Sequence, residues 1–284
     1  MKNNAKTAVI LAGIGGLMIV VGGALGGTGG AAIGLALGLL FTGGSYWFSD
    51  KLAIKAANAV EVSAEQMPRY HAIVADLAQR ADIPMPRLYV SPDPQPNAFA
   101  TGRSPEHAAV CVNKGILDVL TWEELQGVLA HEISHVRNRD ILISSVAASV
   151  AMGITFLAQM AMWASMFGGG GRDRNDNVFG TLAIAILAPI AAAFLQAALS
   201  RSREYEADRR GARLLGTGEP LARALEKLDQ GTRLVPSTVN PAQASAYIAN
   251  PFAGQKSSFS VRMGSTHPPM ADRIARLRSG EWQH

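Results

Sequence analysis

The stretch His131-Glu132-Ile133-Ser134-His135 lies near the middle of the chain and carries two histidines four residues apart. On an α-helix, residues with this spacing lie on one face, one turn apart. Two imidazole nitrogens can then reach a single metal ion at about 2.0 to 2.1 Å. Glu132 stands beside the first histidine, where its carboxylate can act as a general base towards a water molecule. The pattern predicts a catalytic metal centre carried on a helix.

The residues before this stretch predict where its helix begins. Thr121-Trp122-Glu123-Glu124 has the form of a capping box, in which the threonine hydroxyl and the last carboxylate satisfy free amide groups at the helix start. The alternative is that the five-residue pattern occurs by chance, or that its histidines lie on a solvent-exposed surface. A metal centre of this kind also needs a third protein ligand from elsewhere in the chain.

The segment Ser202-Arg203-Glu204-Tyr205-Glu206-Ala207-Asp208 contains candidates for that third ligand. Glu204 and Asp208 are one helical turn apart, so one carboxylate can bind the metal while the other holds a ligand histidine by its second ring nitrogen. Successive helical residues turn by about 100°, so Glu206 projects from nearly the opposite face to Glu204. The alternative is a solvated helix face with ion pairs between its own arginines and carboxylates.

Long charge-free stretches dominate the rest of the chain. Apolar residues make up 48% of the sequence, which is unusual for a soluble protein, and residues 7–49, 141–171 and 177–200 contain no charged side chain. A membrane-spanning helix needs about 20 apolar residues. The glycine-rich sequence 26–30 favours a turn within the first stretch. We therefore predict four transmembrane helices, at residues 7–25, 31–48, 141–167 and 178–199.

Two other interpretations of these stretches are available. A cleaved signal peptide would also start with basic residues such as Lys2 and Lys6, but the first stretch is far longer than the core of about 7 to 15 residues that such peptides have. The two later stretches would alternatively be buried helices of a soluble protein. Their length without a single charge argues against that alternative.

The basic residues lie on one side of the predicted transmembrane helices. The net charge of +4 and a pI near 9.4 would fit nucleic-acid binding, but the basic residues flank the apolar stretches while the connecting turns carry no charge or balanced charges. By the positive-inside rule, both termini and both polar regions are expected in the cytoplasm, with membrane lipids and no nucleic acid as partners. The single cysteine, Cys111, fits a reducing compartment. The flanking basic residues are Lys2, Lys6, Lys51, Lys55, Arg137, Arg139, Arg201 and Arg203.

The two polar regions, residues 51–140 and 200–284, are each too small to make a good domain alone. They are expected to meet as the two parts of one catalytic domain, so that the whole fold is mainly α and integral to the membrane, with a small sheet. The expected elements are helices at Ser63–Arg80, Arg201–Leu215 and Met270–Arg278, and short strands at Arg87–Val90 and Ala108–Val112.

Several segments of the chain resemble the HtpX-type membrane metallopeptidases, which are relatives of the CAAX prenyl endopeptidases. These segments are Pro96–Gly102, His131–His135 with Asp140 just beyond, Ser200–Asp208, and Thr266–Pro269 leading to Arg273-Ile274. The resemblance implies a zincin-like α+β catalytic domain at the cytoplasmic face.

The resemblance also implies roles for individual residues. His131, His135 and Glu204 would bind one zinc ion per chain, with Glu132 as general base and Asp208 as the carboxylate that holds a ligand histidine.

Three further residues are candidates for contacts with the substrate, and two of them have a second interpretation. Asn97 and Ala98 resemble the edge segment with which thermolysin-like enzymes pair a substrate backbone by strand addition. Asn97 is equally interpretable as a turn residue after Pro96. His267 resembles the family histidine near the cleft, where it would donate to the oxyanion of the reaction, but it is nearly as well explained as a cap for the helix that starts at Met270.

The resemblance implies an endopeptidase of the inner membrane that cuts misfolded or damaged membrane proteins at cytoplasmic segments, as part of quality control and the stress response. A prenyl-protein endopeptidase is an alternative, but it is expected to enclose its site within more spans than four. A transporter or metal-binding scaffold is another. Transporters place ionisable residues within their spans, and the predicted spans contain none.

Overall fold

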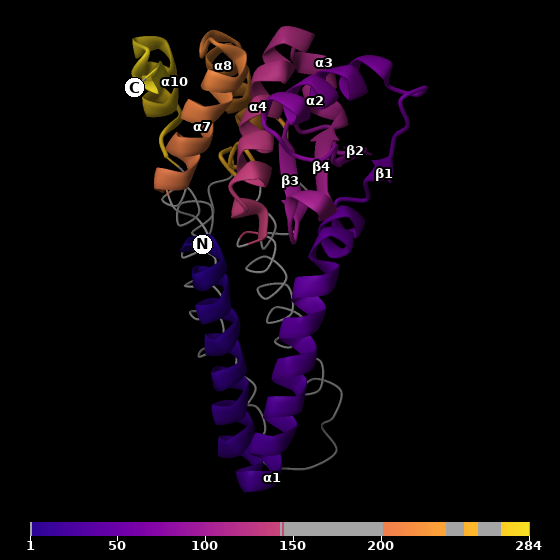
Figure 1. The fold of residues 1–284 in the computed structure, drawn as a ribbon, viewed down its shortest axis with the longest axis vertical. Helices are drawn as coiled ribbons and strands as arrows, with labels where there is room; N and C mark the ends of the chain where they lie inside the picture. Colours follow the sequence, from indigo (N-terminus) through magenta and orange to yellow (C-terminus); the bar gives the residue numbers. More distant parts are fainter. Residues whose placement is uncertain (1, 143, 145–200, 237–246, 255–267, 284) are drawn as a thin grey trace.

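The computed structural model describes residues 2–142, 144, 201–236, 247–254 and 268–283. Figure 1 shows a head, built from helices and a small sheet, above a long helical hairpin. The chain starts close to the boundary between these two parts, and its C-terminal end lies in the upper part of the head. The described part of the chain is mainly helical with a small sheet, as the sequence predicts.

The helices account for most of the described residues. Helix α7 has the bounds predicted from the sequence, and α10 is one residue longer than predicted, whereas no helix was predicted where α8 forms. The helices are α1 (Lys2–Ala56), α2 (Pro68–Arg80), α3 (Lys114–Val119), α4 (Trp122–Arg137), α7 (Arg201–Leu215), α8 (Glu219–Leu234) and α10 (Met270–Ser279), with short 3-10 turns η1 (Pro105–His107) and η3 (Glu281–Gln283).

The sheet has the strand order β1-β2-β4-β3. Strands β2 and β4 confirm the two predicted strands and pair in parallel, whereas β3 pairs with β4 and β1 with β2 in the antiparallel sense. Every residue of β4 is buried, which fits its run of β-branched and small apolar side chains. The strands are β1 (Val60–Glu61), β2 (Arg87–Ser91), β3 (Ala98–Gly102) and β4 (Ala108–Asn113).

Helix α2 begins five residues later than the sequence predicts. A turn precedes it, in which the Ser63 amide donates to the Gln66 side chain at 2.8 Å and the Met67 amide donates to the Ser63 carbonyl at 3.0 Å. Pro68 is the first helical residue. Proline has no amide hydrogen to donate, so it fits only the first turn of a helix and sets the start of α2.

Helix α4 occupies the centre of the head and packs against α2, α7, α8 and β3. Its predicted capping box is present: the Thr121 amide donates to the Glu124 carboxylate at 2.8 Å, and the Glu124 amide donates to the Thr121 hydroxyl at 3.3 Å. Lys227 of α8 also donates to the Glu124 carboxylate at 2.7 Å. The cap therefore fixes the start of α4 and ties it to a neighbouring helix.

Two glycines allow neighbouring helices to approach the backbone of α4. A Cβ atom on Gly127 would lie 2.4 Å from the Leu221 nitrogen, so α8 packs directly on this part of α4. A Cβ atom on Gly211 of α7 would lie 3.0 Å from the nitrogen of His131. The contact at Gly127 leaves no room for a larger side chain, and the one at Gly211 would be tight for any Cβ atom. The contact at Gly211 holds α7 beside His131 of α4.

Helix α4 ends at Arg137, before the third predicted span begins at residue 141. Asn138 caps the helix, with its amide donating to the Ser134 carbonyl at 3.1 Å. Arg139 follows with a φ of 59°, in the left-handed region that ends a helical run. The chain therefore changes direction before Asp140.

Helix α1 doubles back on itself near its middle (Figure 1). Gly27, which has a φ of 60°, lies within the turn predicted from the glycine-rich sequence. The two arms approach closely, because a Cβ atom on Gly34 would lie 2.2 Å from the Met18 carbonyl oxygen and one on Gly38 would lie 3.3 Å from the Cα of Gly15. Glycines one turn apart allow such close packing between two helices.

Within the described residues, no helix combines the length and the apolar character that crossing a membrane requires. The predicted transmembrane helices at 141–167 and 178–199 lie outside the described residues, apart from Ile141, Leu142 and Ser144. Residues 235–266 are described only at 235–236 and 247–254.

Candidate metal centre

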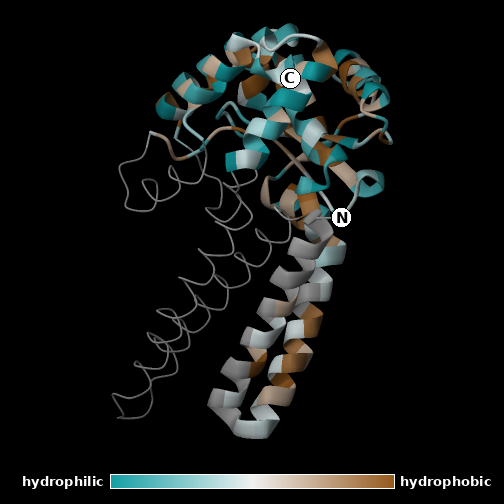
Figure 2. Cartoon of the chain, turned by 60° about the vertical axis from the view of Figure 1, so that its left-hand side comes forward, coloured by the Kyte–Doolittle hydropathy of each residue, from teal (hydrophilic) through white to brown (hydrophobic). Residues whose placement is uncertain are grey.

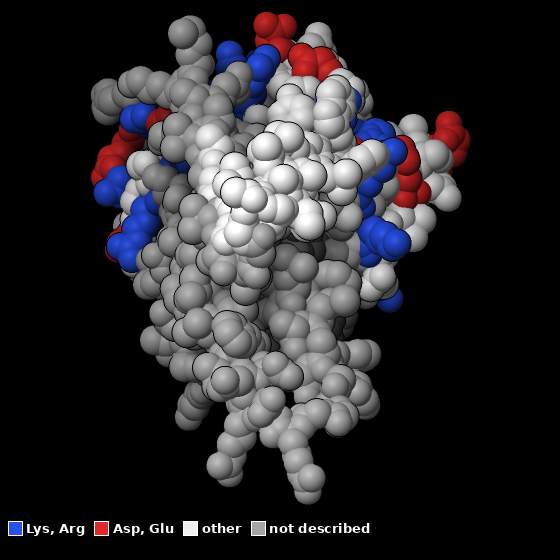
Figure 3. Space-filling view, turned by 90° about the horizontal axis from the view of Figure 1, so that it is seen from below, with Lys and Arg blue, Asp and Glu red and all other residues white. Residues whose placement is uncertain are grey.

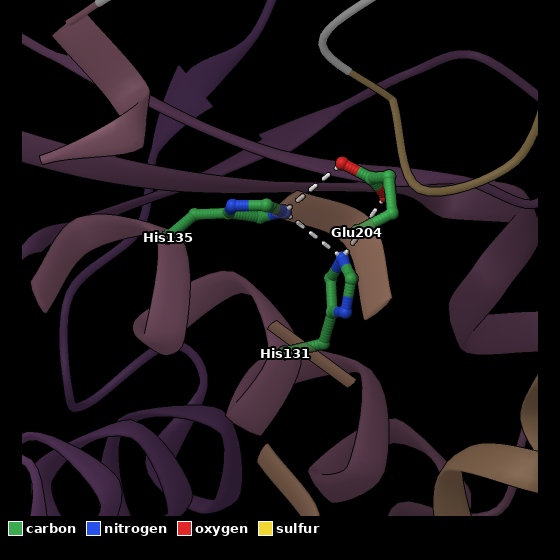
Figure 4. A group of neighbouring side chains, drawn as sticks. All are labelled: His131, His135 and Glu204. Carbon is green, nitrogen blue, oxygen red and sulfur yellow. Dashed lines mark hydrogen bonds and ion pairs between the residues drawn. The ribbon is translucent and has the colours of Figure 1, made fainter. Parts of the chain in front are cut away.

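The three predicted metal ligands converge in the head (Figure 4). His131 and His135 come from consecutive turns of α4, and Glu204 comes from the first turn of α7. The two Nε2 atoms lie 3.1 Å apart, and the Glu204 carboxylate oxygens lie 3.6 Å from Nε2 of His131 and 3.4 Å from Nε2 of His135. Each residue directs one ligand atom at the same point.

These separations fit a tetrahedral zinc ion. Ligand atoms at about 2.05 Å from a tetrahedral ion lie about 3.3 Å from one another, close to the three observed distances. Two unprotonated imidazole nitrogens at 3.1 Å would repel each other without a cation between them. Two imidazoles and one carboxylate are also the ligand set of several catalytic zinc sites, which keep one position open.

Each histidine is held at its other ring nitrogen by a carboxylate. Nδ1 of His131 lies 2.8 Å from the Asp208 carboxylate, the arrangement proposed from the spacing of Glu204 and Asp208. Nδ1 of His135 lies 3.2 Å from Asp140. Such contacts fix the tautomer and leave each Nε2 free to bind the metal. Asp140 had no predicted role, because its approach to His135 depends on the reversal at Arg139.

Arg273 is a second residue whose role the sequence did not reveal. It is fully buried, and its guanidinium forms two hydrogen bonds to the Asp208 carboxylate, at 2.7 and 2.8 Å. The same group lies 3.4 Å from Nδ1 of His131, but the shorter contact of that nitrogen to Asp208 identifies the carboxylate as its acceptor. Arg273 therefore orients the residue that orients His131.

Charge compensation determines the ionisation of these buried carboxylates. Burial by itself would raise the pKa of Asp208, but Arg273 and His131 outweigh it and lower that pKa to about 2. Burial likewise opposes ionisation of Glu204, yet the two histidines bring its pKa well below the usual value. Both groups are therefore carboxylates at neutral pH, and they make the centre attractive to a cation.

Glu132 has a different environment. It is 2% exposed, and burial raises its pKa above the usual value, although the neighbouring histidines and a backbone hydrogen bond from Ala100 act in the opposite direction. A carboxylate with a raised pKa is a better proton acceptor than an ordinary surface glutamate. Its position next to His131 places this base beside the metal centre.

The other predicted site residues lie elsewhere. Asn97 is fully buried, and its side chain bonds to Ala249: Nδ2 donates to the carbonyl at 2.8 Å, and the Ala249 amide donates to Oδ1 at 3.2 Å. The Ala98 carbonyl accepts from the Ile248 amide at 3.0 Å. The substrate-pairing role of Asn97 and Ala98 remains a prediction, and His267 lies outside the described residues.

A buried base held beside a cation site of two histidines and a glutamate is the arrangement by which metallopeptidases hydrolyse peptide bonds. Comparison with known proteins agrees with this class. The model of peptidase family M48 matches residues 64–281. The chain belongs to peptidase family M48 and is a metallopeptidase.

Individual relatives match almost the full length of the chain. It is 44% identical over 280 residues to a protease HtpX homolog of Pelotomaculum thermopropionicum, covering 98% of this chain and 99% of that protein. A protease HtpX homolog of Syntrophotalea carbinolica is 48% identical over 282 residues, covering 98% of each chain. The crystal structure of S. mikatae Ste24p has a similar fold, with a TM-score of 0.52 and 20% identity, over 97% of this chain and 65% of that one.

The choice of Glu204 rather than Glu206 as the third ligand is open to a graded test. We expect Glu204→Gln to abolish nearly all zinc binding, and Asp208→Asn to weaken it by about 10- to 100-fold because His131 loses its charged partner. Glu206→Gln should leave zinc binding unchanged, since Glu206 pairs with Arg210 at 2.6 Å on the other side of the helix. Zinc content after dialysis provides the measurement. Loss of zinc in the Glu206 variant, with zinc retained in the Glu204 variant, would contradict the assignment.

The contact between Asp140 and His135 has its own expected effect. Asp140→Asn should lower zinc affinity by about 10- to 100-fold, because the imidazole loses the carboxylate that fixes its orientation. Asp76→Asn is the matched control, as Asp76 pairs with Arg80 at 2.9 Å on the exposed side of α2. Competition with a zinc-binding dye measures both affinities. Wild-type affinity in the Asp140 variant would show that His135 needs no such partner.

Proposed function

We propose that this chain is a zinc-dependent endopeptidase, with His131, His135 and Glu204 as the zinc ligands and Glu132 as the general base. The observation that carries this proposal is the burial of Glu132 directly beside three convergent ligand atoms. If the two histidines lay on a solvent-exposed surface, the neighbouring Glu132 carboxylate would be exposed to water as well. The same arrangement on a buried helix fits a site that holds both a metal ion and a reacting peptide.

The chain's own residues account for the proton transfers of the proposed reaction. A bound zinc ion supplies Lewis acidity. Glu132 accepts a proton from the attacking water and transfers it to the nitrogen of the departing amine, so one buried carboxylate acts first as base and then as acid. Asp208 and Asp140 keep the two imidazoles in the orientation that leaves Nε2 available. In this proposal His267 donates to the oxyanion of the reaction.

We further propose that the chain is integral to the membrane through four helices, at residues 7–25, 31–48, 141–167 and 178–199, with residues 51–140 and 200–284 forming the catalytic domain. The charge-free stretches support this arrangement. The second arm of α1 also exposes large apolar side chains, such as Ile33 at 63% and Leu40 at 77%, which water solvates poorly. Figure 2 shows this apolar arm extending away from the hydrophilic head.

The charge distribution supports a cytoplasmic catalytic domain in the inner membrane. Lys51 and Lys55, near the end of α1, are exposed, as are Arg137 and Arg139, at and just beyond the end of the metal-binding helix, and all four lie on the same side of the predicted spans. Figure 3 views the molecule from the hairpin end and shows Lys and Arg side chains, interspersed with Asp and Glu, around the margin of the head. This placement fits a head that rests on the cytoplasmic surface of the membrane.

The proposed substrates are misfolded or damaged membrane proteins, cut at their cytoplasmic segments for quality control during stress. An unfolded segment offers an extended backbone, which a strand edge can recognise through main-chain groups whatever the side chains are. Asn97 and Ala98, at the start of β3, are the proposed pairing residues.

The general-base assignment predicts separate effects on metal binding and turnover. Glu132→Gln should retain zinc, but its rate of casein hydrolysis should fall by about 10²- to 10⁴-fold, since the base is removed while all three ligands remain. Glu123→Gln, on the exposed side of the same helix, should hydrolyse casein like the wild type. A zinc chelator should abolish hydrolysis by both the wild type and this control. Wild-type turnover by the Glu132 variant would refute the assignment.

The proposed membrane topology predicts the location of two points on the chain. A reporter enzyme that is active only outside the cytoplasm should be silent when fused after His284. It should be active when inserted near Gly170, because that turn joins the third and fourth proposed spans on the opposite side. The reverse pattern would place the catalytic domain outside the cytoplasm.

A further inference from the structure

The segment Tyr247–Ala249 lies along the outer edge of β3, opposite β4. Phe99 and Tyr247 form an antiparallel bridge, and the Ile248 amide donates to the Ala98 carbonyl at 3.0 Å. The rings of Phe99 and Tyr247 are in contact, with centroids 5.1 Å apart. This part of the edge therefore already has a peptide paired to it, in the manner of strand addition.

The side chain of Asn97 extends this pairing by one residue. It accepts from the Ala249 amide and donates to the Ala249 carbonyl, so one amide group satisfies both main-chain groups of a single residue. These contacts involve only the backbone of the bound segment. A peptide of any other sequence in the same extended conformation offers the same groups.

The bound segment also reaches the metal centre. Arg273 donates to the Ile248 carbonyl at 2.9 Å, and the same guanidinium binds Asp208, the partner of His131. The Ile248 carbonyl is thus joined to a predicted zinc ligand through only two side chains. A peptide in this position has its backbone held at three points, by Ala98, Asn97 and Arg273.

We infer that residues 247–249 are a built-in pseudosubstrate, which occupies the edge of β3 where a protein substrate pairs and must leave before the substrate binds. This inference rests on the proposed function, since it takes Asn97 and Ala98 as the substrate-pairing residues. Tyr247, Ile248 and Ala249 are all buried, so the occupied state is the ordinary state of the chain. The apparent affinity for substrate is then the intrinsic affinity multiplied by the fraction of molecules in which the edge is open.

A disulfide that locks the segment onto β3 tests this inference directly. Phe99→Cys and Tyr247→Cys face each other across the bridge, where the Cα separation of an antiparallel pair suits a disulfide. Cys111→Ala is included in every protein, because Cys111 of β4 lies opposite Phe99 and would compete for disulfide formation. The full-length zinc-loaded protein is assayed in detergent with fluorescein-labelled casein.

Oxidation should lower casein hydrolysis by about 10-fold or more, and reduction should restore it, because the locked segment cannot leave the edge. The control pair Val60→Cys and Val90→Cys lies opposite each other across β1 and β2, away from the metal centre, and its oxidation should leave hydrolysis unchanged. Equal hydrolysis by the oxidised and reduced forms of the locked protein would overturn the inference.

Binding gives a readout that does not depend on turnover. With Glu132→Gln added, the reduced protein should bind labelled casein by fluorescence anisotropy, and the oxidised protein should bind it about 10-fold more weakly or worse. Equal binding by the oxidised and reduced forms would overturn the inference that the segment is a pseudosubstrate. The two proposals can also fail separately. If the zinc-loaded wild type hydrolyses no casein, the proposed function is refuted. If casein binding by the Glu132 variant still depends on the disulfide in that case, the pseudosubstrate inference is retained.

A single substitution tests whether weaker binding of the segment increases activity, and it removes only one aromatic side chain. Tyr247→Ala removes the ring contact with Phe99, and such aromatic contacts shift an equilibrium by about 2- to 12-fold. If the segment blocks substrate, hydrolysis of casein at low concentration should rise by that factor, while Tyr247→Phe should match the wild type. Unchanged or lower hydrolysis by Tyr247→Ala, in protein of wild-type zinc content, would mean that the segment is a permanent strand.

Discussion

The close crossing of α4 and α7 at Gly211 is the contact on which the rest of the site depends. The glycine lies against the backbone at His131, where a Cβ atom would be 3.0 Å from the His131 nitrogen, so the two helices cross closely. Asp208 lies one turn earlier in α7 and Glu204 a further turn earlier, and both carboxylates therefore face the histidines of α4. A side chain at position 211 would require the neighbouring backbone to shift by a few tenths of an ångström, which would change the position of the third ligand relative to the first two. The glycine thus determines a ligand geometry in which it takes no direct part.

The crossing also concentrates negative charge that the fold must balance. Glu132 and Asp208 are buried close to Glu204, which is 13% exposed, and an isolated buried carboxylate is costly. Arg273 offsets part of this charge through its two bonds to Asp208. The remaining negative charge around His131 and His135 favours a divalent cation. The buried arginine thus stabilises the folded head without occupying the metal position itself.

Local signals in the sequence predicted the elements that local interactions determine. The capping box at Thr121, the bounds of α7 and the two strands β2 and β4 all follow from patterns within a few residues. Helical spacing also predicted that His131 and His135 share a face and that a carboxylate of α7 could join them, and the family resemblance implied that this carboxylate is Glu204. What the sequence could not reveal depends on distant contacts. Asp140 reaches His135 only because Arg139 adopts a positive φ, and Arg273 reaches Asp208 only after α10 has packed against α7 and α8.

The junction between head and hairpin links β3 to the proposed membrane surface. Arg103, which follows the last residue of β3, lies over the Trp47 ring at 4.7 Å and donates to the Trp47 carbonyl at 3.4 Å. Asp50, three residues further along α1, pairs with Arg87 at the start of β2 at 2.6 Å. Two strands of the sheet are therefore attached to the same stretch of α1. An aromatic ring beside basic side chains is typical of the boundary between lipid and water. In the proposed topology, this attachment holds the edge of β3 close to the membrane, within reach of protein segments that have just emerged from it.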